Sequence, residues 1–149
     1  MRKYKVIVLS FIVALWGCTQ QIRVDAENYI KNQAMYEGKP TIISVEIKDI
    51  LENYALFEGK DLEIMALVAH YEKRDSPGWY LTFEKDGEKI RGYEDDYQGF
   101  VPRDAVYLAR WAKKEGGTVT ARGKLMKWGI ELDHLSYKSL TVNTNSPWA

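Results

Sequence analysis

The sequence predicts a mainly β domain: a small five-stranded barrel with one helix between the third and fourth strands and a short helix in front. Three observations favour it. Apolar and polar residues alternate in several segments between residues 62 and 142, as they do in strands. Asp86-Gly87 joins two of these segments in the manner of a two-residue hairpin turn. Residues 102–115 instead have the apolar spacing of a helix. We expect this domain to cover residues 41–144.

The domain is predicted to begin with a short helix, followed by the first strand. Four apolar residues fall at i, i+3, i+4 and i+7, namely Ile47, Ile50, Leu51 and Tyr54. Gly59 ends the turn after that helix. The first strand then places alternate residues in the core, namely Leu62, Ile64, Ala66 and Val68.

The Asp86-Gly87 turn fixes which residues oppose each other in the next two strands. Because two-residue turns need positive φ at both central positions, Asp-Gly is a strong hairpin signal, and Lys85 then faces Glu88. One face of the hairpin is predicted to be core: Trp79, Leu81, Phe83, Ile90 and Gly92. The other is predicted to be solvated or functional: Tyr80, Thr82, Glu84, Lys89, Arg91 and Tyr93.

A helix and two strands complete the predicted domain. Pro102 opens the helix and Gly116-Gly117 stops it, and its buried stripe is Val101, Ala105, Leu108 and Ala112. Strands follow at residues 118–126 and 130–142. The alternation shifts between Leu132 and Leu135, so the last strand must be bent or bulged. Glycines at inward positions, Gly92 and Gly123, fit the tight bends of a closed barrel.

Two motifs resemble those of small envelope proteins built on the OB-fold. An Asn-(x)n-Tyr/Phe-x-Gly-Lys segment is matched by Asn53, Phe57, Gly59 and Lys60. A Gly-x-Val-x-x-x-Gly-Lys segment is matched by Gly117, Val119, Gly123 and Lys124. The resemblance covers about residues 44–143 and implies a five-stranded, partly open barrel. In such barrels the ligand usually crosses the outer face of the second and third strands. The expected ligand-binding residues are therefore Tyr71, Tyr80, Thr82, Arg91 and Tyr93.

Cys18, the only cysteine, follows an export signal. A basic start and a mainly apolar run of eleven residues, 6–16, precede Gly17-Cys18, as in a secretory signal peptide. The segment resembles the lipobox of bacterial lipoproteins, although Trp16 replaces the usual small residue. This resemblance implies that residues 1–17 are removed and that Cys18 carries fatty acyl chains such as palmitate. The alternative is an uncleaved signal anchor with Cys18 as a spare thiol. Residues 18–40 are predicted to be a polar tether with one or two helical turns around Ala26–Gln33, and residues 145–149 a tail.

A short similarity within the chain does not indicate duplication by itself. Tyr36-Glu37-Gly38-Lys39 matches Phe57-Glu58-Gly59-Lys60, and four residues are few enough for chance. The Glu94-Asp95-Asp96 run is interpreted as a solvated loop, because it lacks Gly or Asn at the ligand spacing of a cation site.

The charge and the motifs argue against several classes of function. Without residues 1–17 the chain has 18 basic and 21 acidic side chains, a formal charge of −3, and proteins that depend on phosphate contacts usually have a basic surplus. No arrangement of nucleophile and base, phosphate loop or paired-histidine motif is present, so we expect neither an enzyme nor a cofactor.

The first hypothesis is a binding module on the periplasmic or extracellular face of the envelope, tethered to the membrane through Cys18. Its ligand would be an oligosaccharide, a peptide or a protein. The second is a single-stranded nucleic-acid-binding domain that uses Tyr80, Arg91 and Tyr93, which the charge of −3 disfavours. The third is a haem or metal carrier that uses His70 or His134. His134 and Tyr137 resemble the haem-attachment motif of periplasmic haem chaperones of cytochrome c maturation, although that motif has one more intervening residue. His70 is otherwise predicted to be a hydrogen-bonded residue at the barrel mouth.

Overall fold

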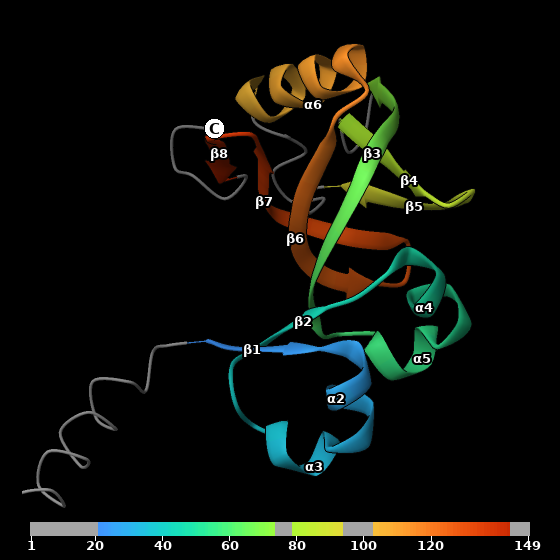
Figure 1. Ribbon diagram of the computed structural model, residues 1–149, viewed down its shortest axis with the longest axis vertical. Coiled ribbons are helices and arrows are strands. Elements are labelled where there is room, and N and C mark those ends of the chain that lie inside the picture. The colour runs from blue at the N-terminus through green and yellow to red at the C-terminus, as the bar shows by residue number, and fades with distance from the viewer. Residues whose placement is uncertain (1–20, 74–78, 94–102, 144–149) are drawn as a thin grey trace, which may run out of the picture.

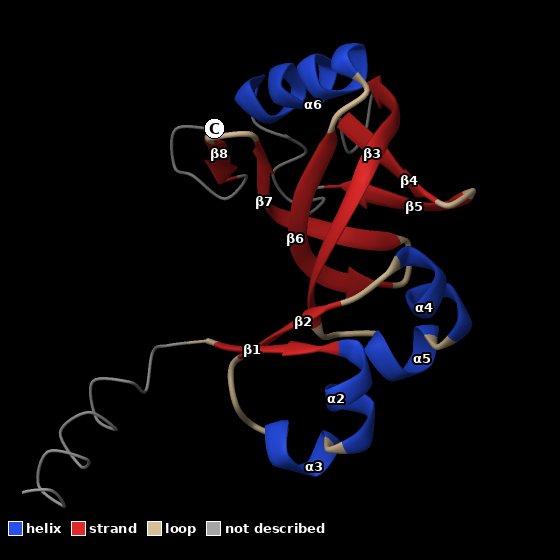
Figure 2. Ribbon diagram, in the orientation of Figure 1, coloured by secondary structure: helices blue, strands red, loops and turns tan. Residues whose placement is uncertain are grey.

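A single mixed β-sheet, curled into a partly closed ring, dominates the protein (Figures 1 and 2). The computed structural model describes residues 21–73, 79–93 and 103–143. The strands are β1 (Ile22–Asp25), β2 (Thr41–Ser44), β3 (Asp61–Lys73), β4 (Trp79–Lys85), β5 (Glu88–Tyr93), β6 (Thr118–Met126), β7 (Gly129–Tyr137) and β8 (Leu140–Asn143). The helices are α2 (Ala26–Lys31), α3 (Gln33–Tyr36), α4 (Ile47–Glu52), α5 (Tyr54–Phe57) and α6 (Arg103–Glu115). The mainly β prediction is confirmed, but the predicted number of five strands is wrong.

The ring follows the order β3-β4-β5-β7-β6 and returns to β3. The long strand β3 makes this possible, because residues 61–67 pair with β6 and residues 67–73 pair with β4. The seam between β5 and β7 is short, a parallel contact that joins Gly92 to Ile130 and Tyr93 to Glu131. The ring interior is the hydrophobic core, with Leu81, Phe83 and Leu125 among its fully buried side chains.

The hairpin register predicted from Asp86-Gly87 is confirmed along its whole length. Lys85 pairs with Glu88, and the opposed pairs run on from there to Tyr80 and Tyr93. Asp86 and Gly87 both have positive φ, 53° and 81°, as this turn requires. The predicted core residues Leu81, Phe83 and Ile90 are buried, whereas the side chain of Trp79 lies outside the described part.

The predicted irregularity after Leu132 is confirmed, but residues 130–142 are not one strand. The pairing of β6 with β7 passes from Gly123–Leu132 to Arg122–His134, so Asp133 is the extra residue of a bulge. The strand ends at Tyr137 and turns back as β8, which pairs with β7 alone among the described strands. Lys138 has a φ of 55°, a backbone angle that occurs in two-residue hairpin turns and not in extended strands.

The predicted tether is wrong for residues 21–40, which fold onto the ring. β1 pairs in parallel with β2, and β2 in parallel with β3. The helical turns expected around Ala26–Gln33 are present as α2. One face of α2 buries Ala26 and Tyr29 in the main core, and the Tyr29 ring lies 6.2 Å from that of Phe57. These apolar contacts and the pairing of β1 and β2 together hold residues 21–40 against the ring.

The internal similarity proves to be a structural repeat with an offset of 21 residues. α2 and α4 are related by this offset, as are α3 and α5. Asn32 and Asn53 join the helices of each pair with nearly the same backbone angles, and each donates a side-chain hydrogen bond of 3.1 Å to the carbonyl four residues earlier. Gly38 and Gly59 then turn each unit at φ 71° and 80°. The four matching residues in the sequence are the end of this repeat, and over most of the helices the two units share backbone conformation without sharing side chains.

Helix α6 covers one end of the ring, as expected from its spacing. Ala105, Leu108 and Ala112 are buried, while Val101 lies outside the described residues. Glu115, the last residue of α6, bonds to two residues at the β7–β8 turn. Tyr137 Oη donates to Glu115 Oε1 at 2.8 Å, and Lys138 Nζ lies 3.1 Å from the same oxygen. In the described residues, no helix is both long and apolar enough to cross a membrane.

The contacts of Glu115 predict a dependence of stability on pH. The hydrogen bond from Tyr137, followed by that from Lys138, lowers the pKa of Glu115 from its ordinary value of 4.5. The resulting stabilisation is therefore present above that ordinary value and is lost as pH falls through the lowered pKa of the folded state. We expect urea unfolding to show Glu115→Gln less stable than the wild type near about pH 6, with a difference that shrinks towards about pH 3. The control is Glu88→Gln at the exposed hairpin turn. A difference independent of pH would show that the charge of Glu115 is not what stabilises this end of α6.

Candidate functional site

A bulge in β3 decides which residues reach the outer face of the hairpin. Val68 pairs with Phe83, but the next pair joins His70 to Thr82, so Ala69 is the extra residue. The bulge places Tyr71 opposite Leu81, on the face that points into the ring. Tyr71 packs against the core there, and its prediction as a member of the binding face is wrong. His70, expected at the barrel mouth, is exposed and joins that face instead.

The aromatic residues of the face pack more closely than the sequence suggested. The guanidinium carbon of Arg91 lies 5.1 Å from the centre of the Tyr80 ring, within cation–π range. The rings of Tyr80 and Tyr93 are 6.4 Å apart. Tyr93 is only 9% exposed, so its prediction as a solvated residue is wrong and Tyr80 is the accessible ring of the pair.

The structure brings His70, Thr82 and Arg91 into one row across β3, β4 and β5. His70 is opposite Thr82, and Thr82 is opposite Arg91. Directly opposed residues share a face, with Cβ atoms about 4.5–5.5 Å apart. The contact with Tyr80 restricts the guanidinium, and a guanidinium presents paired donors to a carboxylate or phosphate. The row can therefore hold an anionic group, with a hydroxyl and an imidazole beside the arginine.

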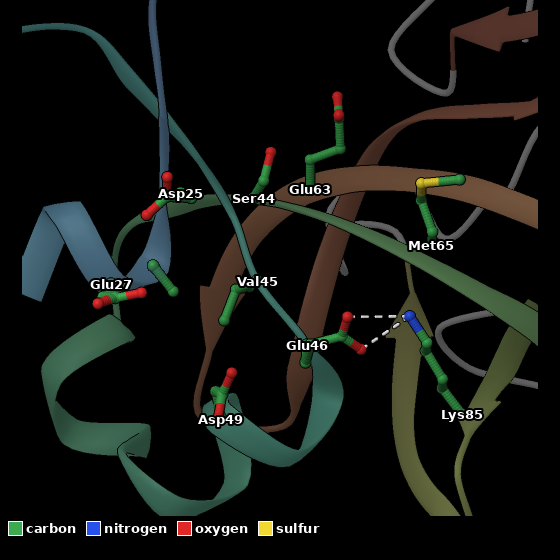
Figure 3. Close-up of a pocket in the computed structure, with 10 residues that line it drawn as sticks. Asp25, Glu27, Ser44, Val45, Glu46, Asp49, Glu63, Met65 and Lys85 are labelled. Atoms are coloured by element: carbon green, nitrogen blue, oxygen red, sulfur yellow. Dashed lines mark hydrogen bonds and ion pairs between the residues drawn. The ribbon is translucent and has the colours of Figure 1, made fainter.

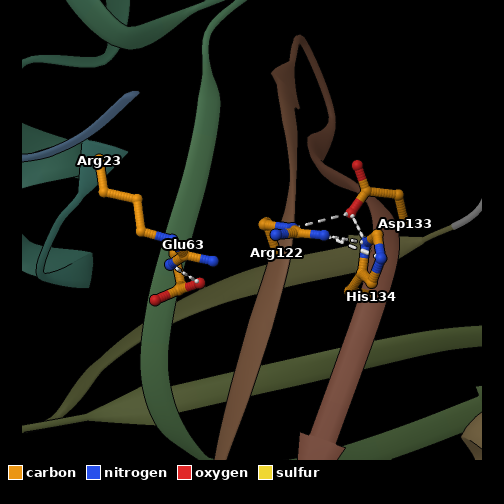
Figure 4. Close-up of polar contacts among 5 residues, drawn as sticks. All are labelled: Arg23, Glu63, Arg122, Asp133 and His134. Carbon is orange, nitrogen blue, oxygen red and sulfur yellow. Dashed lines mark hydrogen bonds and ion pairs between the residues drawn. The ribbon is translucent and has the colours of Figure 1, made fainter. Parts of the chain in front are cut away.

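A second polar group lies on the outer face of β6 and β7 (Figure 4). Nδ1 of His134 lies 2.6 Å from Oδ1 of Asp133, and Nη2 of Arg122 lies within 2.8 Å of both ring nitrogens. With Nδ1–H donating to Asp133, Nε2 accepts from Arg122. A bond from His134 to haem or a metal would have to displace one of these partners, so the geometry gives the haem hypothesis no support. The described residues hold no group of three or more His, Cys, Asp or Glu side chains suited to a metal ion.

A hollow of about 350 Å³ beside α2 and α4 is lined with acidic residues (Figure 3). Most of them already have cationic partners: Glu46 lies 2.9 Å from Lys85, and Glu63 lies 2.9 Å from Arg23. The backbone and side chain of Asn28 donate to Asp25, and they lower its pKa. These ion pairs and caps stabilise the junction between the repeat and the ring, and we do not interpret the hollow as a binding site.

The comparisons with known proteins add no assignment. No family model matches this chain, and a search of curated proteins finds no match. The function is therefore inferred from the geometry of the row and from the sequence around Cys18. Cys18 lies outside the described residues, as does Glu94-Asp95-Asp96.

Proposed function

We propose that this protein is a binding module of the cell envelope, anchored to a membrane by lipid on Cys18 and without catalytic activity. The basic start, the short apolar run and Gly17-Cys18 support the anchor. The ring supports the binding role, because it presents a polar, partly aromatic face on strands held by a rigid core.

We also propose that the ring is a variant of the OB-fold. Its strands pair in the order β3-β4-β5-β7-β6 with α6 between β5 and β6, which agrees with a five-stranded barrel whose helix lies between the third and fourth strands. Strands β1, β2 and β8 would then be additions outside the barrel. By this correspondence β4 and β5 are the second and third barrel strands, whose outer face usually carries the ligand.

The ligand that this face fits best is an acidic oligosaccharide. The single observation behind this choice is the guanidinium of Arg91 stacked on Tyr80 and aligned with Thr82 and His70. The accessible ring of Tyr80 suits the apolar face of one sugar, the guanidinium suits a carboxylate, and the hydroxyl and imidazole suit sugar hydroxyls. An exported protein meets such polymers in the envelope.

A single-stranded nucleic acid is the second candidate, since bases also stack on aromatic rings beside arginine. The burial of Tyr93 leaves a platform of one accessible ring, and the charge of −3 opposes the approach of a polyanion. The single accessible ring favours the glycan, and the charge of −3 opposes a glycan with few carboxylates less than a nucleic acid with a phosphate at every nucleotide.

The anchor predicts that Cys18 is required for membrane attachment. Cells grown with labelled palmitate should incorporate label into the wild-type protein, and globomycin should block removal of residues 1–17. Cys18→Ala should carry no label. The control is Ser10→Ala, a change within the predicted signal that leaves Cys18 in place. Label in Cys18→Ala, or none in the wild type, would contradict the anchor.

The ligand is tested by calorimetry with three probes. The purified protein should bind the disaccharide–peptide fragments that a muramidase releases from peptidoglycan, which carry carboxylates. It should bind the neutral chito-tetrasaccharide at least about ten-fold more weakly, which corresponds to about 1.4 kcal/mol. A thymidine oligonucleotide should not bind at low salt. Tight oligonucleotide binding that weakens steeply with salt would favour the nucleic-acid function instead.

A further inference from the structure

An apolar surface lies between α6 and β8. It is a groove of about 460 Å³ lined by Tyr107, Leu108, Trp111, Leu140, Thr141 and Val142. Three of these side chains are unusually exposed for their size: Tyr107 at 52%, Trp111 at 38% and Leu140 at 53%. Gathered apolar side chains on a surface commonly mark an interaction site, and aromatic residues are the preferred anchors of such sites.

The groove is built from fixed parts. The Trp111 ring meets that of Tyr137 edge-on, with centroids 5.0 Å apart and an interplanar angle of 86°. Tyr137 in turn donates to Glu115 at the end of α6. A Cβ atom on Gly117 would collide with the ring of Tyr137, so the helix end and the hairpin are in close contact. A ligand would meet a surface that needs little ordering, which favours affinity.

Cations surround the groove. The guanidinium carbon of Arg110 lies 6.0 Å from the Tyr107 ring centre, and Nζ of Lys138 lies 5.1 Å from that of Trp111. Lys113 and Lys114 occupy the last turn of α6. The acid of that turn, Glu115, is already bonded to Tyr137 and Lys138. In a chain that is acidic without residues 1–17, this end is locally basic and complements an acidic partner.

The strand that borders the groove can accept another strand. β8 pairs with β7 and with no other described strand. In a hairpin with a two-residue turn, the two residues that flank the turn hydrogen-bond to each other, and the backbone N–H and C=O groups of the next pair point outward. The backbone N–H and C=O of Thr141, in that next pair, are therefore directed away from β7. An extended peptide beside β8 would place alternate side chains over the groove.

From this geometry we propose that the groove between α6 and β8 binds an extended acidic peptide segment of a partner protein, by strand addition to β8 and insertion of one bulky apolar side chain against Trp111. α6 and β8 lie at the end of the molecule opposite β1 (Figure 1). β1 begins four residues after Cys18, so the groove lies at the other end of the molecule from the point where the described chain begins. The site uses no residue of the hairpin row and is independent of the proposed glycan ligand.

The test is a selection of phage-displayed random twelve-residue peptides on the full-length protein in neutral phosphatidylcholine nanodiscs. The enriched peptides should combine a bulky apolar residue with at least two acids. Synthetic copies should bind at least ten-fold more weakly to Trp111→Ala and to the double variant Lys113→Glu/Lys114→Glu. Trp128→Ala is the matched control, since Trp128 is 70% exposed in the β6–β7 turn, and it should bind as the wild type does. Circular dichroism checks that each variant is folded, and Trp111→Phe should restore part of the affinity.

Three results would overturn the proposal. One is the absence of any enriched peptide. Another is a set of peptides whose binding is unaffected by Trp111→Ala. The last is binding of the protein-loaded nanodiscs to phosphatidylglycerol vesicles that Trp111→Ala abolishes, together with no enriched peptide. That result would make the groove a lipid-binding surface.

Discussion

Gly123→Ala is expected to destabilise the protein by about 3 kcal/mol or more, the upper end of the cost of overfilling a core. The Cβ atom would collide with the carbonyl oxygen of Glu131 and lie 2.7 Å from its carbonyl carbon. Both are backbone atoms of β7 beside its bulge, so a side-chain rotation cannot relieve the collision. β6 and β7 would have to separate at the bulge, where Gly123 pairs with Leu132.

Urea unfolding of Gly123→Ala against Lys124→Ala measures this effect. Lys124 is the next residue along β6 and is exposed, so its change should stay within about 0.5 kcal/mol of the wild type. If Gly123→Ala were as stable as Lys124→Ala, the close approach of β6 and β7 would be wrong.

Phe83→Ala is expected to cost about 3–5 kcal/mol, because it leaves a cavity at the centre of the ring. Phe83 is fully buried on β4, and its ring fills the space beside Gly92, where a Cβ atom would lie 2.5 Å from Cε2 of Phe83. The two positions should therefore be coupled. Gly92→Ala should damage the wild type more than it damages Phe83→Ala.

A double-mutant cycle by urea unfolding checks the coupling. The free-energy changes of mutations at contacting sites commonly depart from additivity by about 0.5 kcal/mol or more. Glu84→Ala, the next residue on β4 and part of a surface ion pair with Lys89, is the control and should change stability little. Additive effects of Phe83→Ala and Gly92→Ala would place the ring of Phe83 elsewhere.

The sequence predicted best what short-range chemistry determines. Asp86-Gly87 specifies its turn through backbone angles alone, so the register followed without knowledge of the rest of the chain. The spacing of α6 was equally local. Strands β1 and β2 were missed because each has four residues and is stabilised by parallel pairing with a segment about twenty residues away, which no local pattern encodes.

The binding face was predicted only in part, because some of its positions depend on local register and others on contacts between distant segments. Thr82 and Arg91 belong to the hairpin, whose register is local. Tyr71 and His70 exchanged faces because of the extra residue Ala69 in β3, and an alanine fits either side of a strand without disturbing the apolar alternation. Tyr93 lies where β5 meets β7, a contact between segments that are distant in the sequence.

We propose that Arg91 serves binding and not folding, and a pair of variants separates the two roles. Arg91→Ala and Lys89→Ala remove neighbouring cations from the same face of β5, and each should change the free energy of unfolding by less than about 0.5 kcal/mol. In calorimetry with the muramidase fragments, Arg91→Ala should lose at least about ten-fold in affinity, while Lys89→Ala should bind as the wild type does. Wild-type affinity in Arg91→Ala would show that Arg91 does not contact the ligand. A loss of binding that accompanies unfolding would show that Arg91 serves the fold.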